Sequence, residues 1–321
     1  MLSGTSQRLI LLALLLAVPA SLLLATSLGS SGFVWPWQAD ETGRRILLEL
    51  RLPRALAALA TGSLLAIAGC LMQVLLRNPL ADPYILGLSG GAAAFSLAGL
   101  MLGLAWLPLP LLSFLGAMIS VVVVFVLARG SGPWSTTRLL LTGVVVAAGW
   151  GALISLMLAL GPDASLRSML YWLMGDLSHA ALSAYWLIPL AALVLVMALR
   201  GRTLNVLSTG ATQAALLGES TRARFWEIYL LASLLTGLAV SLAGAIGFVG
   251  LIVPHLMRLL VGADHRRLLP AAALFGGTFL VIADTLARTL FAPRQLPVGV
   301  LTALIGVPLF LLLLHRAARL R

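Results

Sequence analysis

The stretch AGAIGFVGLIVPHLMR, residues 243–258, is mostly apolar but contains three glycines and a proline. Inside a lipid bilayer, no water is available to bond the backbone N–H and C=O groups that a helix break releases. Breaks at membrane depth are therefore tolerated where protein covers the backbone or where it lines a watery path, as in transporters. We predict that Gly244, Gly247, Gly250 and Pro254 form the broken-helix backbone of a transporter.

The composition of the whole chain agrees with a membrane location. Of its 321 residues, 61% are hydrophobic and only 10% are charged, and the mean hydropathy is +1.07. This leaves too little polar surface for a soluble globule of this size, so we predict an all-α polytopic membrane protein. The net charge of +11 could suggest nucleic acid, but the arginines form short clusters between apolar runs. Membrane orientation explains such clusters better, and we expect no nucleic-acid partner.

Two absences narrow the chemistry. All 21 basic residues are arginines, and without lysine the chain can form neither a P-loop nor a lysine Schiff base. The single cysteine, Cys70, allows no internal disulfide and no cysteine cluster. We therefore expect that the chain does not itself hydrolyse ATP and is not an enzyme.

Ten apolar runs are long enough, or nearly long enough, to cross a bilayer. They lie near 9–28, 55–76, 84–107, 111–128, 139–160, 181–199, 225–246, 248–262, 270–290 and 297–314. The first is longer than the apolar core of a cleaved signal peptide, so we expect a retained helix. The eighth is short for a crossing of ~20 residues. An even number of spans places both termini on one side. If that side is cytoplasmic, two thirds of the arginines lie inside, as the positive-inside rule requires.

The second and seventh runs echo each other. Thr61-Gly62 precedes Ala68-Gly69, and Thr236-Gly237 precedes Ala243-Gly244 at the same spacing. The two runs are five spans apart and so cross in opposite directions, which is typical of inverted repeats with a substrate path between them. Because small residues are common in membrane helices, chance agreement is the alternative.

Six longer blocks carry a family resemblance. They are LRLPR at 50–54, QVLLRNPLADPYILGLSGGA at 73–92, AGAIGFVGLIVPHLMR at 243–258, DHRRLLP at 264–270, ADTLAR at 283–288 and LPVGVLTALIGVP at 296–308. In this order they resemble the permease subunit of bacterial ABC importers for iron chelates, haem and vitamin B12. The resemblance implies a homodimer of ten-helix subunits in the inner membrane with a path along the dimer axis. It also implies two cytoplasmic ATPase subunits, which hold ATP and Mg, and a periplasmic binding protein. No cofactor is expected on this chain.

The longest inner segment is the cytoplasmic coupling loop at 200–224. Its middle has a short run of apolar residues that ends at a glycine, a helix-stop signal. From spacing alone, an ordinary surface helix is the simpler interpretation. In similar importers this region forms short coupling helices that sit in a cleft of the ATPase. The resemblance therefore implies this role for Ala211, Ala214, Ala215, Leu216, Leu217, Gly218 and Glu219.

Arg51, Arg54 and Arg288 are cations expected on the outer side. Arginines at a membrane boundary usually extend to lipid headgroups. In similar permeases, arginines at these motif positions meet acidic residues of the binding protein, a role that suits the planar, permanently charged guanidinium. Asp284 lies four residues before Arg288 and can pair with it within one helix. Arg51 and Arg54 are therefore the stronger docking candidates.

A cytoplasmic gate is expected at Ser135 and Thr136, which match positions that narrow the exit in similar permeases. Small hydroxyl residues there can equally cap the helix that begins near Arg138. Both interpretations stay open.

We predict no dedicated metal ligand. No pair among His179, His255 and His265 has the i, i+4 spacing of a helical metal site. A large chelate also needs weak contacts so that it can leave the path. In similar permeases the binding protein selects the cargo. A ferric siderophore or haem is our first choice, and cobalamin is the second.

An ion-coupled secondary transporter is the alternative from another class. It would need ionisable groups on an interior path, and the candidates are Asp284, Glu227 and Asp176. The first has an arginine nearby, the second lies beside inner arginines, and the third belongs to an outer loop. A receptor or assembly scaffold is disfavoured by the broken helices.

Overall fold

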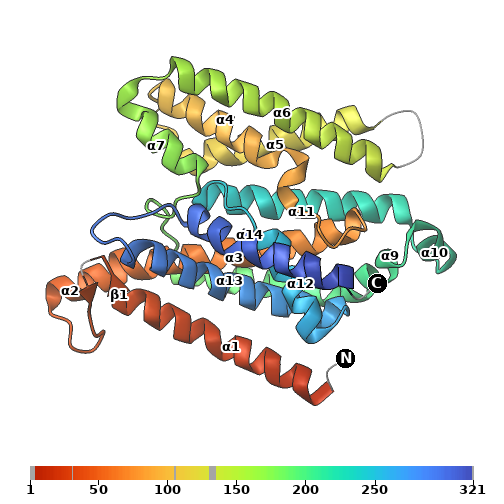
Figure 1. Cartoon of the computed structure of the whole chain (residues 1–321), viewed down its shortest axis with the longest axis horizontal. Helices are drawn as coiled ribbons and strands as arrows, with labels where there is room; N and C mark the ends of the chain where they lie inside the picture. Colours follow the sequence, from red (N-terminus) through yellow and green to blue (C-terminus); the bar gives the residue numbers. More distant parts are fainter. Residues whose placement is uncertain (1–3, 31, 105, 130–134, 320–321) are drawn as a thin grey trace.

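The computed structural model describes residues 4–30, 32–104, 106–129 and 135–319, and most of them are helical (Figure 1). The first half contains α1 (Gly4–Ser27), β1 (Leu28–Gly29), β2 (Gly32–Phe33), α2 (Glu41–Arg45), the π-helical η1 (Ile46–Arg51), α3 (Leu52–Leu75), the 3-10 turn η2 (Pro83–Leu86), α4 (Leu88–Met101), α5 (Leu109–Ala128) and α6 (Thr136–Leu160). The second half contains α7 (Asp163–Leu173), η3 (Ala184–Trp186), α8 (Leu187–Leu199), α9 (Gly201–Ser208), α10 (Ala211–Leu216), α11 (Thr221–Ala243), α12 (Val249–Val261), α13 (His265–Thr289) and α14 (Val298–Arg319).

The all-α prediction is confirmed, and each predicted apolar run falls on a helix or a helix pair. In the described part of the chain, six helices are long and apolar enough to cross a membrane. The pair α8 and α9, bent by 48°, makes a seventh if it counts as one span. The other three runs correspond to the shorter apolar helices α4, α12 and α14. The count of ten is therefore not confirmed by helix length. The run at 84–107 is shortened because Gly87, at φ +71°, separates η2 from α4.

Helix α3 is the centre of the molecule, and its residues from Arg54 to Leu75 are all buried. It packs against α13, α11 and α12. A Cβ atom on Gly62 would lie 2.2 Å from the carbonyl oxygen of Gly276 in α13, and one on Gly69 would lie 1.9 Å from that of Gly250 in α12. Glycines thus let these backbones approach closely, as is usual where membrane helices cross.

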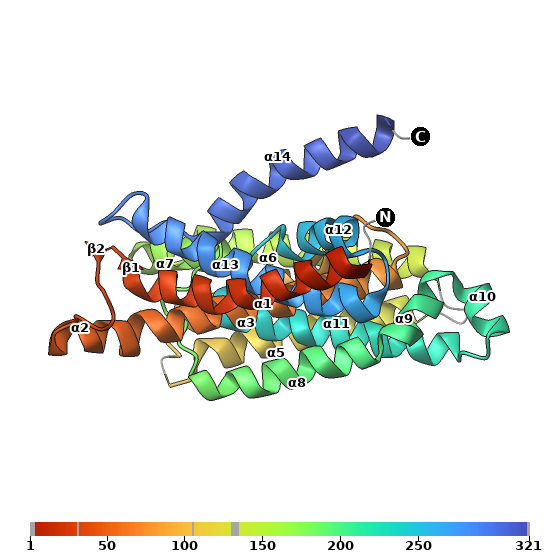
Figure 2. The ribbon, with the colours of Figure 1, turned by 90° about the horizontal axis from the view of Figure 1, so that it is seen from below.

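A second group of helices, α4 to α7, lies beside this core (Figure 1). It is joined to the core where α11 packs against α5 and α4. Helix α6 is almost wholly exposed along its apolar length, and α14 stands away from the rest of the bundle (Figure 2). Helix α1 packs against α13.

The molecule has two distinct ends along its long axis (Figures 1 and 2). One, the α2 end, carries α2, β1, β2 and α7. The other, the α10 end, carries α9 and α10, and here α1 begins and α14 finishes. Helices α3 and α11, which hold the two copies of the sequence echo, run in opposite directions (Figure 1). An inverted repeat requires this arrangement, although the arrangement alone does not establish one.

Candidate functional site

The helix break lies between α11 and α12. Gly244 and Phe248 both have left-handed backbones, at φ +67° and φ +71°. A Cβ atom on Gly244 would lie 2.3 Å from the carbonyl oxygen of Trp172. Glycine is therefore needed there for two reasons, the backbone angle and the close approach.

Protein groups bond the backbone that this break releases. The carbonyl oxygen of Ala243 accepts from the N–H of Asp176 at 2.9 Å. The N–H of Ile246 donates to the hydroxyl of Tyr84 at 3.2 Å. The break is thus covered from two sides, as backbone at membrane depth must be.

Two of the four predicted break residues lie elsewhere. Gly247 is in the connection, but Gly250 and Pro254 are inside α12. The prediction of a break at Gly250 and Pro254 is therefore wrong. A proline within a helix removes one backbone hydrogen bond, and α12 continues past it to Val261.

A buried group of charges, which we call the arginine cluster, lies at the α2 end and consists of Arg51, Arg54, Asp284 and Arg288. The Nε and NH2 groups of Arg54 donate to the Asp284 carboxylate at 3.0 and 2.8 Å, and its NH1 donates to Gln295 at 3.0 Å. Arg288 Nε lies 3.1 Å from the same carboxylate. One carboxylate is thus shared by two guanidinium groups.

Arg51, the third arginine of the cluster, donates hydrogen bonds to backbone carbonyls at and just after the end of α1. Arg51 donates to the carbonyl oxygens of Thr26, Ser27 and Gly32 at 3.0, 2.8 and 3.2 Å. Arg288 also donates to the carbonyl of Ala25 at 3.1 Å. The alternative, in which these arginines extend to lipid headgroups, does not describe them, because all three are buried. Their charges bond protein groups instead.

The three arginines of the cluster line a cavity of about 410 Å³, together with Glu49, His179 and Gln295. The three arginines outnumber the two nearby carboxylates, Glu49 in the lining and Asp284 behind it, so the excess charge there is positive. Such a cavity suits a carboxylate or another anionic group that reaches in from the α2 end.

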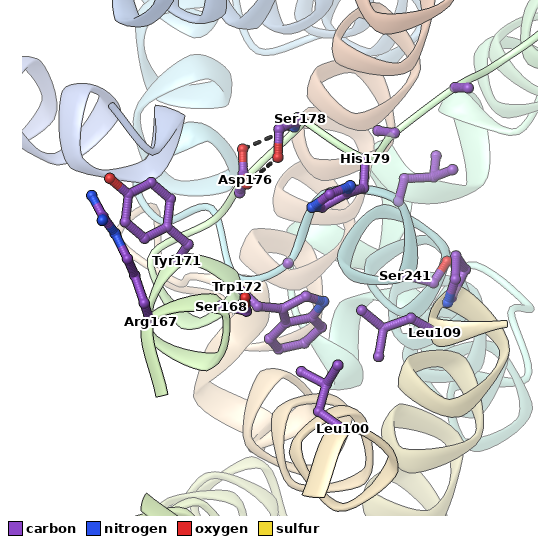
Figure 3. A pocket seen from close by; sticks show the side chains of 15 residues that line it. Leu100, Leu109, Arg167, Ser168, Tyr171, Trp172, Asp176, Ser178, His179 and Ser241 are labelled. Atoms are coloured by element: carbon purple, nitrogen blue, oxygen red, sulfur yellow. Dashed lines mark hydrogen bonds between the residues drawn. The ribbon is translucent and has the colours of Figure 1, made fainter. Parts of the chain in front are cut away.

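A second cavity, of about 550 Å³, lies next to the first. Figure 3 shows Trp172 beside Leu100 and Leu109 in its lining, with His179 across from them. The Arg167 guanidinium lies 5.7 Å from the centre of the Tyr171 ring. The short segment 178–181 lines both cavities and so separates them.

At the α10 end, the predicted coupling loop is itself helical. Leu216 and Leu217 are 83% and 68% exposed, whereas Ala214 is fully buried. The apolar residues of this run therefore do not share one face, because successive helical residues point about 100° apart. Ala214 packs inward and the two leucines face outward. Gly218, at φ +86°, follows the helix as its predicted stop signal.

A network of ion pairs holds the segment that follows α10. Glu219 pairs with Arg224 at 3.2 Å, and Arg224 pairs with Glu227 at 2.7 Å. Glu227 also pairs with Arg200, at the end of α8. The segment that carries α10 is therefore held to α11 by charge.

The two gate candidates lie at the start of α6. The Ser135 hydroxyl accepts from the N–H of Arg138 at 3.3 Å and caps the helix, and Thr136 is its first residue. The capping interpretation thus describes Ser135, and the gate role is not tested by this contact. Part of the preceding loop, residues 130–134, lies outside the described residues.

The other candidate groups are engaged or dispersed. Across the ranges that the structure describes, no three or more His, Cys, Asp or Glu side chains gather where they could hold a metal ion. Of the acids that an ion-coupled transporter would need, Asp284 and Glu227 pair with arginines and Asp176 accepts from Ser178.

Sequence reasoning missed the pair between Arg54 and Asp284, which are 230 residues apart. It considered only the pair of Asp284 with Arg288. The available signal was that LRLPR and ADTLAR both lie at the outer ends of predicted spans, with opposite charges on the same side. Helix packing, which the sequence did not reveal, makes them partners.

These features define a class: a polytopic membrane protein with a protein-covered helix break, a cationic cavity at one end and a protruding apolar helix at the other. The family model described as the FecCD transport family matches residues 9–316. The chain belongs to this family of transport permeases.

Relatives with assigned transport roles are similar over nearly their whole length. The hemin transport system permease protein HmuU of Yersinia pestis is 41% identical, with 96% of this chain and 94% of the relative covered. The Fe(3+) dicitrate transport system permease protein FecD of Escherichia coli K12 is 42% identical, with 94% and 96% covered. The vitamin B12 import system permease protein BtuC of Vibrio vulnificus is 39% identical, with 96% and 93% covered.

A solved structure agrees with the fold. It is described as an inward-facing conformation of a transporter assigned to the metal-chelate type of ABC transporter. It is 31% identical, with a TM-score of 0.87, and covers 96% of this chain and 99% of its own. The family resemblance seen in the sequence is confirmed.

Proposed function

We propose that the chain is the membrane-spanning permease subunit of an ATP-driven importer that moves a metal chelate from periplasm to cytoplasm. The chelate is a ferric siderophore or haem, and the path runs along the axis of a homodimer. Relatives named for hemin and ferric dicitrate transport support this cargo class. The chain binds no cofactor of its own in this proposal, because ATP and Mg belong to the ATPase partners.

The proposed orientation places the α10 end in the cytoplasm and the α2 end in the periplasm of an inner membrane. The arginines predicted for the inner side include Arg200, Arg202, Arg222 and Arg224, which lie next to α9 and α10. The positive-inside rule favours this choice. Both termini are then cytoplasmic.

The observation that carries the proposal is α10. Helix α10 has six residues and lies beyond the apolar bundle, and Leu216 and Leu217 at its end are exposed. Exposing these leucine side chains to water is unfavourable. Exposed apolar residues at the end of a rigid element are typical of a protein contact. We infer that Ala215, Leu216 and Leu217 contact an ATPase subunit, while Ala214 and Glu219 hold the helix in place.

At the opposite end, the arginine cluster supports docking of the periplasmic binding protein. Its cavity is cationic and open, so acidic side chains of a partner can reach it. Because the three guanidinium groups already bond protein groups, a partner carboxylate would join the cluster rather than meet free cations. The gate role of Ser135 and Thr136 is retained as part of the proposal.

The test is reconstitution in liposomes with the ATPase subunits and the binding protein, using hemin, ferric dicitrate and cyanocobalamin as probes. Leu216→Asp with Leu217→Asp should release the ATPase subunits and abolish uptake while leaving binding-protein docking intact. Leu102→Asp with Trp106→Asp, at similarly exposed positions near the α2 end, should leave the ATPase subunits bound. If the α10 variant keeps both ATPase subunits and uptake, the coupling contact lies elsewhere.

Two alternatives have distinct outcomes in the same assay. Uptake of cyanocobalamin alone would support cobalamin import by the same machinery, which the similarity to a vitamin B12 permease also allows. Uptake that follows a proton or sodium gradient without ATP would support an ion-coupled transporter. The second is disfavoured because its candidate acids are already paired.

A further inference from the structure

Asn205 lies in α9, the helix before α10, and bonds to the first turn of α13. Its Nδ2 donates to the carboxylate of Asp264 at 2.7 Å, and its Oδ1 accepts from the backbone N–H of His265 at 2.9 Å. Nδ1 of His265 lies 2.7 Å from the same oxygen. Because an amide oxygen only accepts, Nδ1 carries the ring proton. A reversed amide would lose all three contacts, so asparagine fits this place in one orientation.

The backbones of the two helices are also close at this junction. A Cβ atom on Gly201, at the start of α9, would lie 2.6 Å from the backbone nitrogen of Arg266. Asp264 caps α13 by accepting from the same N–H at 3.1 Å. Burial acts to raise the pKa of Asp264, but the hydrogen bonds from Asn205 and Arg266 outweigh it and lower the pKa. The carboxylate is therefore charged at neutral pH.

Helix α13 connects this junction to the arginine cluster. It is continuous over 25 residues, which corresponds to about 37 Å at the rise of an α-helix. Its first turn meets Asn205, and its last turns carry Asp284 and Arg288. Figure 2 shows it running from the α2 end toward the α10 end. One helix thus reaches from the proposed docking cavity to α9, the helix that precedes the proposed ATPase contact.

We propose that Asn205 is a positioning residue that couples α13 to α9 and α10, so that a displacement of α13 at the arginine cluster moves the ATPase contact. This rests on the proposed function. Coupling between two sites requires an element whose arrangement both sites bias. Helix α13 carries two residues of the arginine cluster and packs against α9, which in turn packs against α10. Asp264 is exposed and Asn205 is half-buried, so their hydrogen bond contributes little to overall stability. Its loss should uncouple the two ends without unfolding the protein.

A charge exchange tests this. Asn205→Asp places a second carboxylate next to that of Asp264 and opens the junction by repulsion. Adding Asp264→Asn restores the contact with donor and acceptor exchanged. The amide introduced at 264 then donates to the carboxylate at 205, which still accepts from both donors of His265.

The measurement is ATP hydrolysed per cargo molecule taken up by the complete importer in liposomes, with the probe that the wild type transports best. Asn205→Asp should keep its ATPase subunits and its unstimulated hydrolysis but use about fivefold more ATP per cargo, or worse. The double variant should return to within about twofold of the wild type. Ser208→Ala is the matched control, because its hydroxyl bonds only within α9, to the carbonyl of Asn205. It should not change the ratio.

Two outcomes overturn the inference: an unchanged ratio in Asn205→Asp, or a double variant no better than the single one. If Asn205→Asp fails to assemble, Asn205→Ser removes the contacts without adding charge, and normal coupling in that variant also overturns it. A wild type without ATP-driven uptake contradicts the proposed function instead, so the two failures are distinguishable.

Discussion

Asp284 neutralises part of the buried positive charge at the α2 end of the core. It is almost fully buried and faces two guanidinium groups, each held by further bonds to protein. A buried charge without a partner is far more costly than an exposed one. Removing the carboxylate would leave Arg54 and Arg288 close together in a site with little water.

We therefore expect Asp284→Asn to lower the free energy of unfolding by about 3–5 kcal/mol. Unfolding of the purified protein in detergent measures this. Glu41→Gln breaks the exposed ion pair with Arg45 and should cost no more than about 1 kcal/mol. Equal losses in the two variants would show that the cluster does not stabilise the core.

Docking can be tested at the same cluster. Arg51→Glu with Arg54→Glu should weaken association with the binding protein and make the residual affinity less sensitive to salt, because attraction has become repulsion. Arg44→Glu with Arg45→Glu changes the charge by the same amount about two helical turns earlier, outside the cavity.

The control pair should affect docking less than the cluster pair. Because the cluster arginines also bond protein groups, retained ATPase subunits must first show that the variant is folded. An affinity and a salt slope equal to those of the wild type would exclude docking at this cluster.

At the scale of elements, the crossings of α3 are set by glycine. Gly69→Ala would place its Cβ 1.9 Å from the carbonyl of Gly250, and neither backbone can move without shifting a whole helix. We expect a loss of about 1–3 kcal/mol in the free energy of unfolding.

Gly151→Ala in α6 is the matched control, since its Cβ would meet nothing within 4 Å. Alanine favours a helix over glycine by about 1 kcal/mol, so this variant should be neutral or more stable. If both substitutions have the same effect, close packing does not explain the glycines of α3.

Helix positions were predictable from the sequence because apolar runs report burial in lipid directly. The break at Gly244 was predictable for the same reason, since glycine interrupts such a run visibly. Pro254 was misjudged because a proline alone does not show whether a helix ends or continues. The junction of Asn205 with Asp264 and His265 left no local signal, because it depends on how α9 packs against α13.

At the scale of the whole molecule, the two ends differ in charge and shape, which predicts their sides of the membrane. Cys70, the single cysteine, is fully buried, so introduced cysteines can be labelled without removing it. Trp37 near the α2 end and Leu217 near the α10 end are 66% and 68% exposed and make a matched pair.

An impermeant maleimide should label Trp37→Cys in intact spheroplasts and Leu217→Cys only after the membrane is opened. The wild type, with Cys70 alone, should stay unlabelled in both conditions. The reverse pattern would invert the proposed orientation, and with it the sides assigned to the ATPase subunits and the binding protein.

The residues of the arginine cluster are also synthesised at different times. Arg54 leaves the ribosome 230 residues before Asp284, which at cellular rates of synthesis is a wait of roughly 10–50 seconds. For most of that interval neither α11 nor α13 has been synthesised, so α3 lacks both neighbours. Arg54 must then keep its charge in the headgroup region, where a long side chain can reach water. Helix α3 therefore first takes a position in the membrane that keeps the Arg54 guanidinium near water. Only after Asp284 has been synthesised can this guanidinium become buried in its ion pair.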